Sequence, residues 1–157
     1  MKRLVAVLAS ALLLSGCSLG APPPADINGS GVFDLGVGDC FNGAALQGEV
    51  TSIPVIDCAS KHDFEVYAAS HMDAAAYPGE QRTAGEADAT CTSAFEDFLG
   101  ETFEAAHAAR AYDFTSLYPT AGSWDLGDRQ VLCAITKTDA DGKATKTTGS
   151  LRGSVSG

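Results

Sequence analysis

The N-terminal residues determine which part of this chain folds and in which compartment. Lys2 and Arg3 precede an apolar run from Leu4 to Leu14 that only Ser10 interrupts, which is the arrangement of an export signal. The run has eleven residues, whereas a helix needs about 20 apolar residues to cross a bilayer. We therefore expect the segment to be removed after export and the remaining chain to fold outside the cytoplasm.

The residues at the end of the run, Leu14-Ser15-Gly16-Cys17, resemble the lipobox of bacterial lipoproteins at all four positions. This resemblance implies that residues 1–16 are a lipoprotein signal peptide and that Cys17 becomes the lipidated first residue. Two or more acyl chains hold a protein on a membrane, where a single chain gives only marginal binding. The expected location is the extracytoplasmic face of the cell membrane. The alternative is an ordinary secretory signal that leaves Cys17 as a thiol.

The 141 residues that follow the signal are enough for one domain. Residues 17–31 include three consecutive prolines and several glycines, a composition that builds no core and that is typical of a flexible tether. We expect the folded domain at residues 32–153 and a short tail at residues 154–157.

The charge of the chain limits its partners. Loss of Lys2 and Arg3 with the signal takes the formal net charge from −10 to −12. Such a surface repels phosphate backbones, because binding to nucleic acid depends on Lys and Arg that displace counterions. The expected partners are the membrane, through the lipid on Cys17, and unidentified envelope or division proteins, and we expect no nucleic acid partner.

Hydrophobic periodicity predicts one long helix and several strands. The predicted strands are residues 33–41, 50–58, 63–71, 111–118 and 129–138, and a last strand that follows the turn at Asp141-Gly142 and continues through Thr148. Apolar residues at spacings of three and four from Ala84 to Leu99 predict a helix of about 18 residues that Gly100 ends. Short helical segments are expected at 101–109 and 121–127. The predicted fold class is α+β, a mostly antiparallel sheet of five or six strands with the long helix packed on it.

The third predicted strand has the clearest alternation. Phe64, Val66 and Ala68 are expected on one face, and Glu65 and His71 on the other.

Four cysteines remain after Cys17, and an even number in an exported domain is typical of disulfides. Three pairings are possible, and we favour Cys40 with Cys58 and Cys91 with Cys133. The first pair joins two neighbouring predicted strands, and the second joins the long helix to a core strand. A zinc site is the competing interpretation, but the chain has no Cys-x-x-Cys pair, and we expect neither a metal ion nor a cofactor.

The candidate acid-base residues are His62, Asp63, Glu65 and His71, with His107 further along the chain. Glu65 and His71 are about 20 Å apart along an extended strand, too far to bind one metal ion. His62 and Asp63 are two of the three groups of a hydrolase triad, yet the chain has no Gly-x-Ser-x-Gly elbow and no spare thiol. Surface or turn positions are the more ordinary interpretation of these residues.

Two further motifs have a functional and an ordinary interpretation. Asp139-x-Asp141-Gly142 is similar to the start of a calcium loop, but Lys143 and Ala144 stand where that loop needs an oxygen ligand and a glycine, so we expect a hairpin tip. Arg129 is either a ligand anchor or part of a helix-to-strand turn with a local ion pair.

Several short segments occur along the chain in one order. They are Val37-Gly38-Asp39-Cys40-Phe41, Val55-Ile56-Asp57-Cys58, His62-Asp63-Phe64-Glu65-Val66, Tyr77-Pro78-Gly79, Cys91, Tyr118-Pro119-Thr120, Ser123-Trp124, Gly127-Asp128-Arg129, Cys133 and Gly149-Ser150-Leu151-Arg152-Gly153. Together these segments resemble the septum formation family of actinobacterial envelope proteins. The resemblance covers about residues 35 to 151. It implies an envelope location and a link to cell division, and it transfers no catalytic residue.

These observations favour a non-enzymatic, lipid-anchored binding module of the cell envelope that acts in septum formation. The first alternative is a small envelope hydrolase that uses His62 and Asp63, and the second is a lipoprotein that carries a small ligand.

Overall fold

The computed structural model describes residues 30–31, 34–46, 50 and 52–155. Its strands are β1 (Ser30–Gly31), β2 (Cys40–Phe41), β3 (Ser52–Ile53), β4 (Phe64–His71), β5 (Tyr112–Leu117), β6 (Gln130–Thr138) and β7 (Ala144–Thr145). Its helices are the 3₁₀-helix η2 (Gly43–Leu46) and the α-helices α1 (Glu80–Leu99), α2 (Phe103–Ala108) and α3 (Ala121–Asp125).

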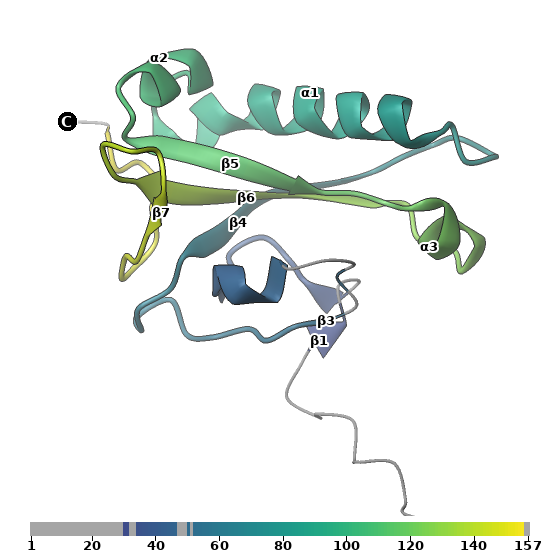
Figure 1. Ribbon diagram of the computed structural model, residues 1–157, viewed down its shortest axis with the longest axis horizontal. Coiled ribbons are helices and arrows are strands. Elements are labelled where there is room, and N and C mark those ends of the chain that lie inside the picture. The colour runs from purple at the N-terminus through teal and green to yellow at the C-terminus, as the bar shows by residue number, and fades with distance from the viewer. Residues whose placement is uncertain (1–29, 32–33, 47–49, 51, 156–157) are drawn as a thin grey trace, which may run out of the picture.

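Five strands form an antiparallel sheet in the order β2-β4-β6-β5, with β7 paired to the end of β6, and β1 pairs with β3 separately. In Figure 1, α1 and α2 lie over one face of the large sheet, and the segment with η2, β1 and β3 lies over the other. The predicted α+β class, with its antiparallel sheet and long helix, is confirmed. The predicted last strand is shorter than expected, because β7 ends at Thr145 and an isolated bridge from Thr147 to His62 follows it.

Two cores lie on the two faces of the large sheet. The helix-side core contains Tyr67, Met72, Ala87, Cys91, Phe95, Phe98, Leu99, Ala106, Tyr112, Trp124, Val131, Cys133, Ile135 and Leu151. The N-terminal core contains Leu35, Phe41, Ile53, Val66, Leu132 and Ala134. Because side chains alternate along a strand, the continuous apolar run of β6 supplies both cores. Central strand β6 therefore joins the two sides of the protein.

The predicted long helix is α1, and its buried face is the expected one. Ala87, Cys91 and Phe95 recur every four residues and are fully buried, which places them on one stripe of the helix. The helix ends at Gly100, whose φ of 90° is the left-handed conformation that favours glycine. A disulfide between Cys91 and Cys133 joins α1 to β6, and this is the favoured pairing.

The N-terminal side of the sheet is less regular than predicted, since strands were expected at 33–41 and 50–58. Gly38 has a φ of 97°, and its N–H donates to the carbonyl of Val66, so the chain turns before β2 and leaves Val37 52% exposed. Pro54 follows β3 and has no N–H to donate to a ladder. Short strands and turns therefore replace the two predicted strands.

The second disulfide closes this irregular side of the sheet. It joins Cys40 in β2 to Cys58, with Cα atoms 5.3 Å apart, and it is the other favoured pair. Cys40 is fully buried, whereas Cys58 is partly exposed. The bond therefore fixes the loop that precedes β4 to the edge of the large sheet.

A register shift between Val66 and Ala68 interrupts the pairing of β4 with β6. Tyr67 and Ala68 both pack on the helix-side core, whereas Val66 belongs to the N-terminal core. The prediction that Phe64, Val66 and Ala68 share a face is therefore wrong for Ala68, because the irregularity reverses the alternation of side chains.

Residues 1–29, which include the predicted signal and Cys17, lie outside the part of the chain that the structure describes. Of the residues expected to form the tether, Ser30 and Gly31 form strand β1. Among the described residues, no helix has both the length and the apolar character needed to cross a membrane.

Candidate functional site

His62 is an enclosed residue that lies just before β4. It is fully buried, and its backbone N–H and C=O both hydrogen bond to Thr147. The ring atom Nδ1 lies 2.9 Å from the carbonyl of Ser60, which places the proton on Nδ1 because a carbonyl oxygen only accepts. Atom Nε2 is buried and has no hydrogen-bond partner within the described residues. The imidazole is therefore held inside the fold.

Asp63 is bound to groups that lie far from it in the sequence. Its carboxylate accepts hydrogen bonds from the N–H of Gly43 at 2.8 Å and from Lys146 Nζ at 3.0 Å. Lys146 Nζ also donates to Asn42 Oδ1 at 2.6 Å. Burial raises the pKa of Asp63, but the hydrogen bonds from Gly43 and Lys146 and the charge of Lys146 outweigh it and lower the pKa below the ordinary carboxyl value. The carboxylate is therefore ionised and internally paired at neutral pH.

Glu65 is a buried carboxylate with two internal donors. Its Oε1 accepts from Ser150 Oγ at 2.6 Å, and its Oε2 accepts from the N–H of Leu151 at 2.7 Å. The prediction that Glu65 and His71 share a strand face is wrong, because the register shift in β4 places His71 on the other face, where it is exposed. These two residues therefore form no common site.

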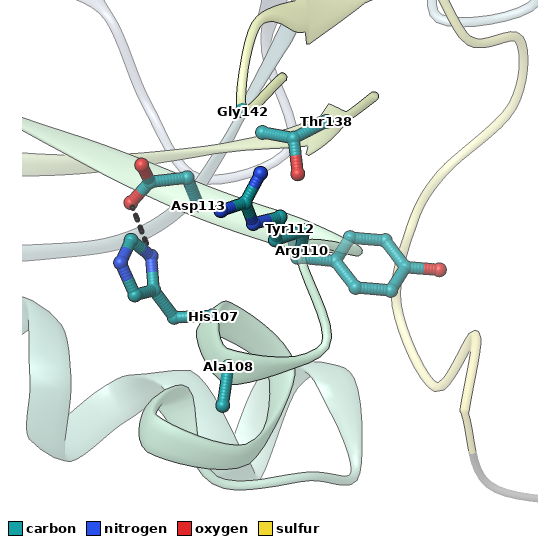
Figure 2. Close-up of a pocket in the computed structure, with 7 residues that line it drawn as sticks. All are labelled: His107, Ala108, Arg110, Tyr112, Asp113, Thr138 and Gly142. Carbon is teal, nitrogen blue, oxygen red and sulfur yellow. Dashed lines mark ion pairs between the residues drawn. The ribbon is translucent and has the colours of Figure 1, made fainter. Parts of the chain in front are cut away.

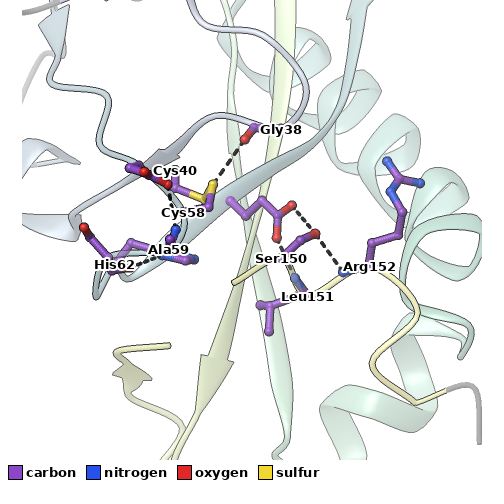
Figure 3. Close-up of a disulfide and its surroundings, with 11 residues drawn as sticks. Gly38, Cys40, Cys58, Ala59, His62, Ser150, Leu151 and Arg152 are labelled. Atoms are coloured by element: carbon purple, nitrogen blue, oxygen red, sulfur yellow. Dashed lines mark hydrogen bonds between the residues drawn. A yellow bond between two sulfur atoms is a disulfide. The ribbon is translucent and has the colours of Figure 1, made fainter. Parts of the chain in front are cut away.

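His62, Asp63 and Glu65 together attach the start of β4 to residues 146–151, and we call these contacts the C-terminal clasp. The N–H of Gly149 adds a hydrogen bond of 2.6 Å to the carbonyl of Cys58. Figure 3 shows the loop of Cys58 and His62 with its disulfide, and the nearby segment Ser150–Arg152. The clasp therefore joins an end of the chain to the loop that the Cys40–Cys58 disulfide fixes.

The clasp partners Lys146, Thr147 and Ser150 were not among the predicted site residues. The Asp63–Lys146 and Glu65–Ser150 hydrogen bonds join residues 83 and 85 positions apart in the sequence. Local patterns carry no information on such contacts. The one available signal was the resemblance of residues 149–153 to a family segment.

A pocket of about 400 Å³ opens between the end of α2 and the β6–β7 hairpin. Figure 2 shows its side chains, which include His107, Arg110, Tyr112, Asp113 and Thr138. Atom Nδ1 of His107 lies 3.7 Å from Asp113 Oδ1. Among the predicted acid-base candidates, His107 is therefore the one that lines this pocket, together with an arginine and a carboxylate that were not predicted.

The sequence model of the septum formation family matches residues 37–157, more than half of the chain. The chain belongs to the septum formation family. Comparisons with curated proteins and with solved structures found no match. The resemblance that the motifs indicated is thus confirmed.

In this septum formation domain, several of the recognisable segments serve internal contacts. Residues 62–66 and 149–153 meet in the C-terminal clasp. The cysteines of the other segments form the two disulfides. The motifs that identify the family are therefore, to this extent, the residues that hold the domain together.

Arg129 takes part in the turn between α3 and β6. Its guanidinium carbon lies 3.7 Å from the centroid of the Trp124 ring, a cation–π contact. Its Nη1 donates to the carbonyls of Trp124 and Asp128 at 2.9 and 2.6 Å. The Asp128 carboxylate instead accepts from Ser123 and Gln130. The turn interpretation is confirmed, with carbonyl contacts in place of the expected ion pair.

The hairpin tip at Asp139–Gly142 is also confirmed. Asp139 Oδ1 accepts from the N–H groups of Asp141 and Lys143 at 2.9 and 3.0 Å. The hydrogen bond from Lys143, which outweighs the effect of burial, lowers the pKa of Asp139. Within the described ranges, no three His, Cys, Asp or Glu side chains are grouped to hold a metal ion.

Proposed function

We propose that this protein is a non-enzymatic binding module that a lipid on Cys17 holds at the extracytoplasmic face of the cell membrane, where it takes part in septum formation. The observation that carries the proposal is the use of the acid-base candidates in the C-terminal clasp. His62 is enclosed, and the carboxylates of Asp63 and Glu65 accept hydrogen bonds from the protein itself. Membership of the septum formation family supports the envelope and division role.

Two features support the location. The lipobox residues Leu14 to Cys17 provide a site for lipid attachment, and an acyl anchor raises the effective concentration of the domain at the membrane. The two disulfides also favour an exported protein, because such bonds persist outside the reducing cytoplasm. Placement at the membrane is thus the central element of the proposed function.

The anchor is tested with Cys17→Ser, which removes the thiol that receives the lipid. Metabolic labelling with a radioactive fatty acid should mark the wild type and not this variant, and Ser18→Ala should label normally as the matched control. A soluble form that starts at Ser18 behind a cleavable secretory signal should fold with both disulfides and fail to complement a deletion strain. Complementation by the soluble form would overturn the role of placement.

The hydrolase alternative is tested with variants that keep the clasp and remove its acid-base chemistry. His62→Asn retains an amide donor toward the carbonyl of Ser60, and Asp63→Asn retains an acceptor for the N–H of Gly43. Both variants should localise and complement as the wild type does. A variant that folds with both disulfides and yet loses all function would favour the enzyme.

A further inference from the structure

The pocket at the end of α2 contains one strained residue. Arg110 has a φ of 52° and is the one non-glycine residue with a positive φ in the described part of the chain. Arg110 directly follows Ala109, the C-cap of α2. The N–H of Arg110 donates to the carbonyl of His107, and the N–H of Ala111 donates to the carbonyl of Ala106. This Schellman arrangement favours glycine at the left-handed position. Strain of this kind is typical of positions where a side chain is needed.

The guanidinium of Arg110 is held at the pocket and retains free donors. Its Nη1 donates to the carbonyl of Ala140 in the β6–β7 hairpin. A guanidinium has five N–H donors, and no other partner of Arg110 lies within the described residues. Figure 2 shows the guanidinium among the side chains that line the pocket. Arg110 is exposed, so these donors are available to a ligand.

Asp113 brings a negative charge to the same pocket. Its Oδ1 accepts from the N–H of Phe114 at 2.8 Å and lies near His107. Its Oδ2 has no hydrogen-bond partner among the residues that the structure describes. The pocket thus presents a cation with free donors and a carboxylate with a free acceptor.

We propose that this pocket binds a small zwitterion, an amino acid or a short peptide, whose carboxylate pairs with Arg110 and whose ammonium group pairs with Asp113. The planar fork of an arginine matches a carboxylate. A phosphate dianion is a poorer fit, because Asp113 and the strongly acidic chain repel it. The volume of about 400 Å³ lies within the range of small-molecule sites, about 300–1,000 Å³.

This inference names a ligand class for the proposed binding role and rests on that role for its biological meaning. The two are tested separately, since ligand binding is measured on purified protein and anchoring is measured in cells. Failure of the ligand experiment leaves the labelling and complementation results unchanged, and the reverse also holds.

The experiment is isothermal titration calorimetry of the full-length exported protein, purified in mild detergent, with the dipeptide Ala-Ala as probe. We expect saturable binding with a Kd on the order of 1 mM, as is usual for a small ligand in a small pocket at the surface. Ala-Ala amide lacks the carboxylate, and N-acetyl-Ala-Ala lacks the ammonium group. Each should bind about tenfold more weakly or worse, because each loses one charge-assisted contact.

Two variants assign the contacts. Arg110→Gln should weaken Ala-Ala binding about tenfold or more, because it removes the charged fork. Lys143→Gln is the matched control, since it removes a positive charge from the β6–β7 hairpin next to the pocket at a residue that does not line the pocket, and it should change the Kd less than about twofold. Asp113→Asn should weaken the binding of Ala-Ala and should not weaken the binding of N-acetyl-Ala-Ala, because the negative charge of Asp113 attracts the ammonium group and repels the carboxylate.

Three results would overturn the proposal. They are a wild type that gives no saturable binding of Ala-Ala at about 10 mM, a Lys143→Gln effect as large as that of Arg110→Gln, and inorganic phosphate that binds more tightly than Ala-Ala. If Arg110→Gln does not fold, as judged by circular dichroism, the ranking of Ala-Ala against its amide on the wild type decides the question.

Discussion

The two sides of the central sheet are built by different means. On the helix side, the 20 residues of α1 present a mostly apolar stripe to the sheet, and its Phe95, Phe98 and Leu99 are buried. On the N-terminal side, strands of two residues and the four-residue helix η2 surround Leu35 and Phe41. A long helix satisfies most of its own backbone hydrogen bonds, whereas short irregular segments need partners elsewhere.

Those partners on the N-terminal side are a disulfide and the part of the C-terminal clasp at Asp63 and Gly149, since Leu151 of the clasp packs in the helix-side core. Cys58 is bonded to Cys40, its carbonyl accepts from Gly149, and Asp63 joins Gly43 to Lys146. The helix side has its own disulfide, but that bond lies inside an aromatic core. We conclude that packing stabilises one side, and covalent and polar ties stabilise the other.

Phe95→Ala should have the largest effect, because it tests packing on the helix side. Phe95 is fully buried, and its ring lies 5.8 Å from Tyr67 and 5.4 Å from Phe103. Truncation of such a side chain costs about 3–5 kcal/mol of the free energy of unfolding. Urea unfolding of the variant measures this loss. Val37→Ala, at a residue that is 52% exposed, should cost less than about 0.5 kcal/mol, and equal losses would contradict the comparison.

Each disulfide can be removed by changing both of its cysteines to alanine, and the two variants test the two sides of the sheet separately. The loops span 42 residues for Cys91–Cys133 and 18 for Cys40–Cys58, so the chain-entropy model gives losses of about 4 and about 3 kcal/mol. Hydrogen exchange should show that loss of Cys40–Cys58 opens residues 34–62 first and leaves α1 protected. Equal loss of protection in α1 and in the N-terminal segment would show that the two sides unfold as one unit.

Asp63→Asn tests the clasp through the pH dependence of the free energy of unfolding. The lowered pKa of Asp63 means that folding favours the ionised form, so its contribution is present above the unfolded carboxyl pKa of about 3.9 and is lost as the pH falls through the folded value. The variant should be about 1 kcal/mol less stable at pH 7. Urea unfolding at a series of pH values measures the difference, which should vanish in acid.

The control for the clasp is Asp125→Asn, at an exposed carboxylate in α3. We expect it to change the stability by less than about 0.5 kcal/mol at every pH. A constant difference between the wild type and Asp63→Asn down to the lowest pH would refute the electrostatic role of Asp63.

Arg110→Gly should have the smallest effect, and its sign is opposite to that of the others. Relief of the left-handed strain favours glycine by about 1–2 kcal/mol, and the greater freedom of glycine in the unfolded chain offsets about 0.5–1 kcal/mol of this gain. We expect a net stabilisation of up to about 1 kcal/mol, seen as a higher Tm. A lower Tm would mean that the hydrogen bond from Arg110 to the carbonyl of Ala140 outweighs the strain.

The sequence predicted some residues of the clasp and of the pocket, but it did not predict their partners. His62, Asp63 and Glu65 were singled out because of their residue types, but their partners near residue 150 lie more than 80 positions away. His107 was also named, whereas Arg110 was not, because a strained arginine at a helix end has no recognisable sequence pattern. The residue types were thus visible, and their roles were not.

The sequence by itself determined the elements whose cause is local. Periodic apolar residues and Gly100 define α1, a run of apolar residues defines β6, and the four cysteines after Cys17 limited the disulfides to three pairings. Only the tertiary structure decided the irregularity after Val66, the enclosure of His62, the clasp and the pocket at Arg110. The physical reason is that these features depend on the energies of contacts between distant segments, which no local pattern contains.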